Sequence, residues 1–283
     1  MQKYNLLERL LFPPTYFNKK KLSSKLKGKT ILITGASSGI GEKVAYLLAD
    51  IHTNLILVAR REEKLSIMKS EIEKEVAKVS IFRADLRNKE EMEELLAFIH
   101  RLPDGLDIVV SNAGISINRS INNSLDRYHD FTRTMAINYF APVQLLLSVI
   151  PLLEKNKGQI ISISTVNALL IPIPFWAAYQ ASKSAFDTWF RSAALELNMM
   201  GISTTSIYLP LVRTPMILPT TAYLKMPAMC PNHVAQIVCK SMYTKRKKYR
   251  PWWLIFGQLT SIFFRGILET YIPNVLRKRR EGK

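Results

Sequence analysis

Residues 29–41 read K-T-I-L-I-T-G-A-S-S-G-I-G, and this stretch decides the fold. Residues 29–34 form a short β-branched apolar run, which is typical of a buried parallel strand. Three glycines follow, and residues 42–49 have the pattern of a helix. A spaced glycine set alone also occurs in ordinary turns, but a strand, a glycine loop and a helix start together bind pyrophosphate on backbone N–H groups. The predicted dinucleotide-binding loop consists of Gly35, Ser37, Ser38, Gly39, Ile40 and Gly41.

The residues at the end of the next strand indicate which dinucleotide the loop is expected to bind. Residues 54–59 (N-L-I-L-V-A) form a second apolar strand. In an NAD-binding unit this strand usually ends in Asp or Glu, which binds the ribose hydroxyls. Here it ends in Arg60 and Arg61. A guanidinium suits a 2′-phosphate, so the sequence favours NADP(H) over NAD(H); the alternative is that both arginines are solvated at a helix start.

Tyr179 and Lys183 stand in the sequence Y-Q-A-S-K, four residues apart. Four residues make about one helical turn, so the phenol and the ammonium share one helix face. A free phenol has a pKa of about 10 and is a poor acid–base group near neutrality. A cation beside it favours the phenolate and lowers that pKa. We therefore predict Tyr179 as an acid–base group and Lys183 as its activating cation.

Apolar runs alternate with amphipathic helical patterns along the remaining chain. Such alternation predicts a parallel sheet with helices on both faces, and 283 residues suit one unit of this kind. Further strands are expected at 79–83, 108–111, 159–164 and 203–208. The predicted fold class is α/β, with a single doubly wound (Rossmann) domain at 27–240. A basic amphipathic extension (1–26) precedes it, and a basic, apolar segment (241–283) follows it.

Cysteine and histidine usage excludes two other kinds of site. Cys230 and Cys239 form neither a disulfide framework nor a metal-binding spacing, and the four histidines are scattered. We therefore predict no metal site. The cysteine usage fits a reducing cytosol, so we expect a cytoplasmic protein.

Four motifs occur in order: T-G-A-S-S-G-I-G at 34–41, S-N-A-G at 111–114, Asn138 in I-N-Y-F, and Tyr179-x-x-x-Lys183. Together they make the chain resemble the short-chain dehydrogenase/reductase family over about residues 27–238. Residues 128–140 (Y-H-D-F-T-R-T-M-A-I-N-Y-F) are also similar to bacterial family members that act on long-chain acyl substrates.

The resemblance implies a hydride transfer between a nicotinamide and a carbonyl or carbinol carbon. Tyr179 would exchange the hydroxyl proton, Lys183 would hold the nicotinamide ribose, and Asn138 would help to hold a water. A hydroxyl at the end of the fifth strand would orient the substrate oxygen. Thr165 takes this place when counted along the strand, but it lies one residue further from Tyr179 than is usual, so Ser164 remains a candidate.

The resemblance also implies a set of cofactor contacts. Asp85 would lie against the adenine, Asn112, Ala113 and Gly114 beside the cofactor, and Pro210, Val212 and Thr214 on the nicotinamide side. Two residues depart from the family pattern: Ser111 replaces a more usual Asn, and Leu211 replaces the usual Gly after Pro210. A homodimer or homotetramer is the assembly expected of such a protein.

The positive charge is concentrated at the two ends of the chain. The formal net charge is +18, to which residues 1–29 contribute +7 and residues 240–283 contribute +10, which leaves +1 for residues 30–239. These basic runs flank apolar residues instead of forming a polar stripe. No nucleic-acid motif is present, so nucleic acid is not an expected partner.

The C-terminal segment is apolar as well as basic. Wound as one helix, it places a polar stripe (Gln258, Ser261, Arg265 and Glu269) opposite a broad apolar face. That face consists of Trp252, Ile255, Phe256, Leu259, Ile262, Phe263 and Ile267. Its uninterrupted apolar part is shorter than a membrane span ordinarily requires, and Arg265 and Glu269 would be costly within one. We expect a helix lying on an anionic membrane surface, on the cytoplasmic face. Packing on a partner subunit or over the substrate, and a true span, are the alternatives.

The expected substrate is hydrophobic, because the predicted substrate cover at about 209–229 and the neighbouring stretch 169–176 are both apolar. The sequence therefore predicts an NADP(H)-dependent reductase of a lipid-like carbonyl, with Tyr179 as proton donor. Alternatives are a fatty acyl-CoA or aldehyde reductase, a steroid or retinoid dehydrogenase, or a membrane-bound dinucleotide sensor with little turnover. The natural substrate, the physiological direction and the stereochemistry do not follow from the sequence.

Overall fold

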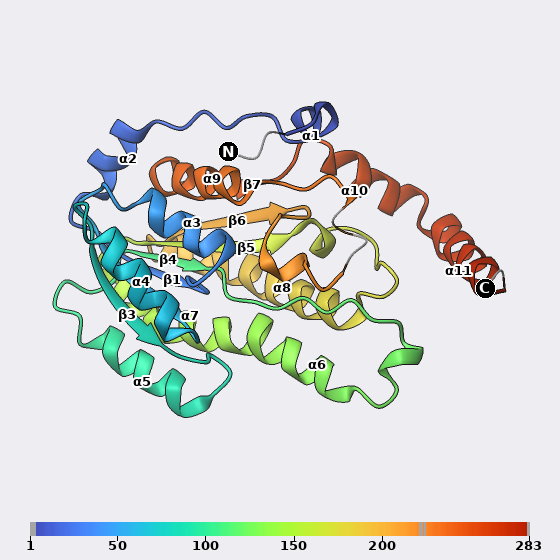
Figure 1. Ribbon diagram of the computed structural model, residues 1–283, viewed down its shortest axis with the longest axis horizontal. Helices are drawn as coiled ribbons and strands as arrows, with labels where there is room; N and C mark the ends of the chain where they lie inside the picture. Colours follow the sequence, from blue (N-terminus) through green and yellow to red (C-terminus); the bar gives the residue numbers. More distant parts are fainter. Residues whose placement is uncertain (1–3, 221–222, 224, 282–283) are drawn as a thin grey trace.

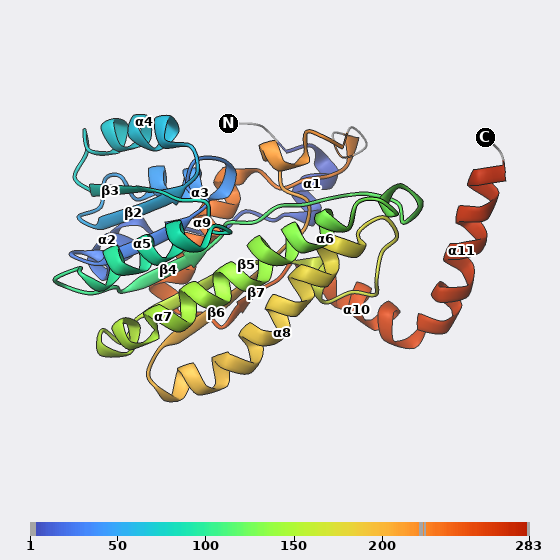
Figure 2. The ribbon, with the colours of Figure 1, turned by 90° about the horizontal axis from the view of Figure 1, so that it is seen from below.

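The computed structural model describes residues 4–220, 223 and 225–281, and within this range it contains one parallel sheet covered by helices (Figures 1 and 2). The seven strands lie in the order β3-β2-β1-β4-β5-β6-β7, and every neighbouring pair is parallel. The strands are β1 (Thr30–Thr34), β2 (Asn54–Ala59), β3 (Lys78–Arg83), β4 (Ile108–Ser111), β5 (Gln159–Thr165), β6 (Ser203–Leu209) and β7 (Lys248–Tyr249). The doubly wound fold is confirmed.

Two hydrophobic cores form because successive side chains of a strand point to opposite faces of the sheet. In β1, Ile31 and Ile33 belong to one core and Leu32 to the other. The first core is covered by α2 (Lys19–Leu26), α3 (Gly39–Leu47), α4 (Glu62–Ile72) and α9 (Pro231–Thr244). The second is covered by α5 (Lys89–His100), α7 (Ala141–Lys155) and α8 (Ala177–Met199). A π-helical turn, η2 (Ala136–Phe140), joins α6 (Tyr128–Met135) to α7.

The strand order reverses beside β1, because β2 lies on one side of it and β4 on the other. In open sheets of this kind, ligands bind at the carboxyl ends of the strands around such a reversal. Because β1, β2, β4 and β5 all end at this edge of the sheet, the side chains that follow them can meet there.

The N-terminal extension packs onto the domain. Leu22 and Leu26 of α2 and Phe12, which follows α1 (Leu6–Leu11), are buried in the first core. Glu8 of α1 is also buried and pairs with Arg213 in the predicted substrate cover. Segments from opposite ends of the sequence are thereby held together across the carboxyl edge of the sheet.

The C-terminal segment differs from the single helix expected from its periodicity. It begins with β7, which pairs with β6, and continues as α10 (Leu254–Phe263) and α11 (Arg265–Glu281), with a break at Phe264. The break separates Arg265 and Glu269 from the stripe formed by Gln258 and Ser261, so the prediction of one continuous helix was wrong. α11 projects away from the domain (Figure 2).

Among the described residues, one continuous helix, Tyr128–Lys155, is long and apolar enough to cross a membrane by length and composition. Its inner side chains, such as Leu145, Leu146 and Val149, lie in the second core. It therefore packs as a core helix of the domain. α10 is apolar but shorter than a span requires.

Candidate active site

A cavity of about 1030 Å³ lies at the carboxyl ends of the strands. Its walls include Arg60 and Arg61 after β2, Asn112 after β4, and Tyr179 and Lys183 of α8. The fold therefore brings residues predicted for the dinucleotide and for catalysis to one cavity. Residues 221, 222 and 224 of the predicted substrate cover lie outside the described residues.

Glycine is required at two positions of the loop because the backbone there has positive φ angles and neighbouring atoms leave no room for a Cβ. Gly35 and Gly39 have φ angles of 66° and 62°. A Cβ on Gly39 would lie 2.9 Å from Cγ2 of Thr214, and a Cβ on Gly35 would lie 2.9 Å from Cα of Ala113. α3 begins at Gly39, and the side chain of Ser38 does not cap it. The N–H groups of its first turn are thus open to an anion such as a pyrophosphate.

Asn112 fixes the loop after β4 against the glycine loop. Its Nδ2 donates to the carbonyl oxygens of Thr34, at 2.9 Å, and of Gly35, at 3.3 Å. The backbone N–H groups of Asn112 and Ala113 both donate to the Thr34 hydroxyl at 3.0 Å. These bonds hold the two cofactor-side loops at a set separation.

The arginines after β2 contact the glycine loop and Asp85. Nε of Arg61 donates to the hydroxyl of Ser37 at 3.1 Å, and its Nη2 donates to the same hydroxyl at 2.9 Å. Arg60 is freer, with 60% of its side chain exposed and a single pair to Asp85 at 3.9 Å. Arg61 is therefore ordered by the loop, while the guanidinium of Arg60 remains available at the cavity wall.

Sequence reasoning missed Arg87, which also lines this end of the cavity. Its Nε donates to Asp85 at 2.9 Å, and this bond, more than any other group, holds the pKa of Asp85 below its usual value. The signal was present, since Arg87 stands two residues after Asp85 in R-A-D-L-R. Three arginines (Arg60, Arg61 and Arg87) thus line the end of the cavity where the adenine is predicted to bind.

The two hydroxyls at the end of β5 point in opposite directions, as the strand period requires. Oγ of Ser164 donates to Oδ1 of Asp187 at 3.4 Å. The hydroxyl of Thr165 instead accepts from the backbone N–H of Asn167 at 3.3 Å, and it lies close enough to the phenol of Tyr179 to lower its pKa. Of the two candidates left open by the sequence, Thr165 is the one that faces Tyr179.

Burial dominates the acid–base properties of the two helical residues. It raises the pKa of Tyr179 to about 12, an effect that the interaction with Thr165 partly offsets. It lowers the pKa of Lys183 to about 8, against the attraction of Asp187. Nζ of Lys183 donates to the carbonyl oxygen of Ile163 at 3.2 Å. The expected lowering of the Tyr179 pKa by Lys183 is therefore not found in this structure.

Asn138 lies in the π-helical turn and is fully engaged. Its Nδ2 donates to the carbonyl of Ile115 and to the hydroxyl of Ser182, each at 3.0 Å, and its Oδ1 accepts from the N–H of Ile115. Single π-helical turns inside helices frequently occur at functional sites. Asn138 thus ties η2 to α8 and to the loop after β4, next to Gly114.

The N-terminal extension and the substrate cover close the cavity together, which the sequence did not predict. Leu11 and Phe12 line the cavity, as do Pro210, Val212 and Thr214. Glu8 accepts from the backbone N–H of Ala228 at 3.1 Å in addition to its pair with Arg213. Burial opposes ionisation of Glu8, but these bonds hold its pKa below the usual value. The carboxylate therefore fastens the cover.

We expect Lys183→Met to stabilise the fold relative to the wild type, and more at pH 7 than at pH 9. The wild-type ammonium is charged in both the folded and the unfolded chain below about pH 8, so the fold bears its desolvation there. As the pH rises above 8, the folded chain releases the proton first, and the wild type regains about 1 kcal/mol by pH 9. Urea unfolding at the two pH values measures this. If the difference in free energy of unfolding between Lys183→Met and the wild type is the same at both pH values, the prediction is contradicted.

Comparisons with known proteins agree with this arrangement. The family model for short chain dehydrogenases matches residues 29–223. The chain is 40% identical over 240 residues to a fatty acyl-CoA reductase from Acinetobacter baylyi, covering 84% of this chain and 80% of that protein. It is 35% identical over 227 residues to the fatty acyl-CoA reductase Rv0547c from Mycobacterium tuberculosis, covering 80% and 77%.

A short-chain dehydrogenase from Sphingobium yanoikuyae, solved in complex with NADPH, superposes with a TM-score of 0.71 at 23% identity, covering 78% of this chain and 86% of that one. This likeness concerns the fold. The family match and the two relatives go further, and confirm the resemblance seen in the four motifs: the chain is an oxidoreductase that belongs to the short-chain dehydrogenase family.

Proposed function

We propose that this oxidoreductase reduces a long-chain acyl thioester, with NADPH as the hydride source and Tyr179 as the proton donor. One observation carries the proposal. The phenol of Tyr179, the hydroxyl of Thr165 and the ammonium of Lys183 converge in a cavity that has a basic end and an apolar end. The two fatty acyl-CoA reductases to which the chain is similar support the substrate class.

NADP(H) is the cofactor that the basic end of the cavity fits. The first turn of α3 suits the pyrophosphate, and Arg60, with Arg61 and Ser37, suits a 2′-phosphate. When bound, the reduced nicotinamide supplies the hydride. Every other part of the reaction falls to side chains of this protein.

Tyr179 acts as the acid in the direction of reduction. Its pKa of about 12 keeps the phenol protonated at neutral pH. A carbonyl oxygen held by Tyr179 and Thr165 takes the phenol proton as the carbonyl carbon gains a hydride and the C=O π bond opens. With a thioester, the resulting hemithioacetal returns its hydroxyl proton to the Tyr179 phenolate as the C=O bond re-forms; its C–S bond breaks, the thiolate leaves, and an aldehyde is formed. Lys183 is charged below about pH 8, and we assign to it the binding of the nicotinamide ribose.

The walls beyond Tyr179 suit an acyl chain. Trp176 lies between Tyr179 and Tyr223: its ring centroid is 5.2 Å from that of Tyr179, and it stacks on Tyr223 at 5.6 Å. Further apolar side chains line this end: Ile173, Met216, Ile217 and Met226. Aromatic and flexible aliphatic walls of this kind bind extended hydrocarbon without demanding one shape.

We expect Tyr179→Phe to lower the rate of NADPH-dependent reduction of hexadecanoyl-CoA and hexadecanal by at least about a hundredfold, because the acid is lost. NADPH binding is expected to remain, since the phenyl ring is kept and the residues that suit the pyrophosphate and the 2′-phosphate lie at the start of α3 and after β2. Tyr16→Phe is the matched control, because Tyr16 is 76% exposed. NADPH fluorescence reports binding, and NADPH oxidation reports turnover.

Two outcomes of that assay contradict the proposal. If the wild type binds NADPH but reduces neither substrate, the chain is a dinucleotide sensor instead of a reductase. If an 11-keto steroid or retinal is turned over and the acyl substrates are not, the steroid or retinoid alternative replaces the acyl one.

For the cofactor, Arg60→Ala is expected to weaken NADPH binding by about tenfold or more, because a charge-assisted contact to phosphate is lost. NADH binding, which involves no 2′-phosphate, stays nearly unchanged. Lys64→Ala, an exposed change one helical turn further on, serves as control. Equal losses for NADPH and NADH mean that Arg60 does not contact the 2′-phosphate.

We further propose that the protein docks on the cytoplasmic face of an anionic membrane through α10. The polar stripe of α10 faces the domain, since Oγ of Ser261 accepts from the backbone N–H of Ile171 at 3.3 Å. The apolar face is left outside, with Phe256, Ile262 and Phe263 at 60%, 70% and 74% exposed. Basic residues 245–248 precede it, and the +10 of residues 240–283 attracts anionic headgroups.

Replacing Phe256, Ile262 and Phe263 together by Ser is expected to reduce binding to vesicles of phosphatidylcholine and phosphatidylglycerol by at least about a hundredfold, because three apolar side chains that would insert into the membrane are lost. Ile67→Ser, on the exposed face of α4, is the control. Co-sedimentation measures binding. Undiminished binding, or a triple variant that instead loses its dimer or tetramer in analytical ultracentrifugation, assigns the face to a subunit contact.

A further inference from the structure

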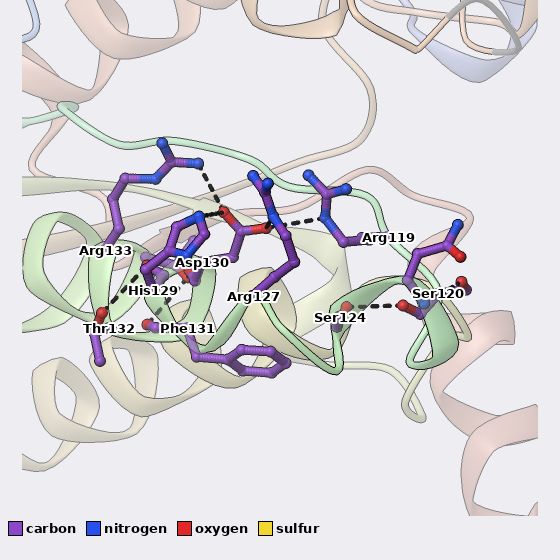
Figure 3. Close-up of polar contacts among 11 residues, drawn as sticks. Arg119, Ser120, Ser124, Arg127, His129, Asp130, Phe131, Thr132 and Arg133 are labelled. Atoms are coloured by element: carbon purple, nitrogen blue, oxygen red, sulfur yellow. Dashed lines mark hydrogen bonds and ion pairs between the residues drawn. The ribbon is translucent and has the colours of Figure 1, made fainter.

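A buried carboxylate on α6 pairs with three arginines (Figure 3), two of which line the cavity. Asp130 is 1% exposed. Its Oδ2 accepts from Nε of Arg119 at 2.9 Å, and its Oδ1 accepts from Nη2 of Arg133 at 3.0 Å. Nε of Arg127 lies 3.6 Å from Oδ2. We call Arg119, Arg127 and Arg133 the arginine cluster.

The arginine cluster carries more positive charge than Asp130 neutralises. Guanidinium groups stay protonated in proteins, so the three arginines and one carboxylate sum to a net charge of about +2. Burial opposes ionisation of Asp130, but the arginines, with Arg119 first, outweigh it and hold its pKa below the usual value. Among the described residues, no second carboxylate pairs with the cluster.

The arginine cluster keeps donors free for another anion. Each guanidinium has five N–H groups, and only one nitrogen each of Arg119 and Arg133 donates to Asp130. The three side chains are 35%, 38% and 44% exposed, so their outer nitrogens reach solvent. Nε of Arg127 is buried and has no hydrogen-bond partner. Asp130 thus orders the three arginines and leaves most of their N–H donors free to bind another anion.

The cluster belongs to the substrate end of the cavity. Arg119 and Arg133 line the same cavity as Tyr179. The backbone N–H of Arg119 donates to the carbonyl of Phe175 at 2.7 Å, which ties it to the loop that carries Trp176. Arg119 follows β4, whereas Arg60 and Arg61 follow β2 on the other side of β1. The cluster is therefore separate from the basic residues that suit the 2′-phosphate.

We propose that the arginine cluster binds the phosphate groups of the coenzyme A part of the substrate. This inference rests on the proposed function and specifies its substrate class. A free fatty aldehyde, a steroid or a retinoid carries no anion that would match a net charge of +2 beside the apolar walls. An acyl-CoA carries its acyl chain and its phosphates on opposite sides of the thioester. The cluster then selects thioesters of coenzyme A over uncharged carbonyls.

The test compares two thioesters that share one acyl chain. For Arg119→Gln and for Arg133→Gln, the KM for hexadecanoyl-CoA is expected to rise about tenfold each, because charge-assisted contacts to phosphate are lost. The kinetics with hexadecanoyl N-acetylcysteamine, which lacks the phosphates, should not change. Lys155→Gln is the charge-matched control. Lys155 ends α7 shortly before the start of β5, so it lies at the edge of the sheet opposite to the cavity.

A binding measurement makes the inference independent of turnover. Calorimetric titration of free coenzyme A into the NADP⁺-saturated protein should show about tenfold weaker binding for each arginine variant. For Lys155→Gln the affinity should equal that of the wild type. Thermal unfolding establishes that the variants are folded, and Arg119→Lys, which keeps the charge, should retain part of the affinity.

The outcomes separate the two proposals. If both thioesters lose activity equally, or if coenzyme A binding is unchanged in folded variants, the arginine cluster only stabilises α6 and the inference is overturned. If no acyl substrate is reduced but coenzyme A binding still depends on the arginines, the anion site stands and the proposed reaction fails.

Discussion

The close packing of three segments of the chain around the glycine loop is the constraint on which the rest of the site depends. Gly35 packs against the loop after β4, and Gly39 packs against Thr214 after β6, at distances that leave no room for a Cβ. Asn112 bonds the first two segments together. Because these contacts fix the carboxyl ends of β1, β4 and β6 relative to one another, they also fix the cavity into which α8 directs Tyr179.

Burial gives this cavity its chemistry. The same loss of solvent keeps Tyr179 protonated and brings Lys183 within reach of neutral pH. Perturbed pairs of this kind are typical of catalytic sites, where burial is tolerated for function at a cost in stability. The arginines that line the cavity fall into two groups, one after β2 and β3 (Arg60, Arg61 and Arg87) and one formed by Arg119 and Arg133, which suits the proposed hydride transfer between two phosphorylated molecules.

Much of this arrangement could be predicted from the sequence, because it depends on short-range patterns. Strand alternation placed β1 to β6 within a residue or two, and helical spacing put Tyr179 and Lys183 on one face. Counting along β5 favoured Thr165 over Ser164 as the hydroxyl at the site. The choice became clear only in the folded strand, where neighbouring side chains point to opposite faces and Ser164 bonds to Asp187. Oligomeric state and membrane association stay predictions.

The features that the sequence did not predict depend on contacts between distant segments. Glu8 and Arg213 are 205 positions apart. Arg119 and Asp130 are only 11 positions apart, but their pairing depends on how the loop after β4 lies against α6. The break at Phe264 ends a periodic pattern that would suit a longer helix. Such contacts arise from tertiary packing, which local periodicity does not encode.

A crystal structure of the protein with NADP⁺ tests the account most directly. The account predicts the pyrophosphate at the first turn of α3, the 2′-phosphate against Arg60, and the nicotinamide ring beside the hydroxyl of Tyr179. A dinucleotide bound with its nicotinamide away from Tyr179, or with its 2′-phosphate at the arginine cluster, would contradict it.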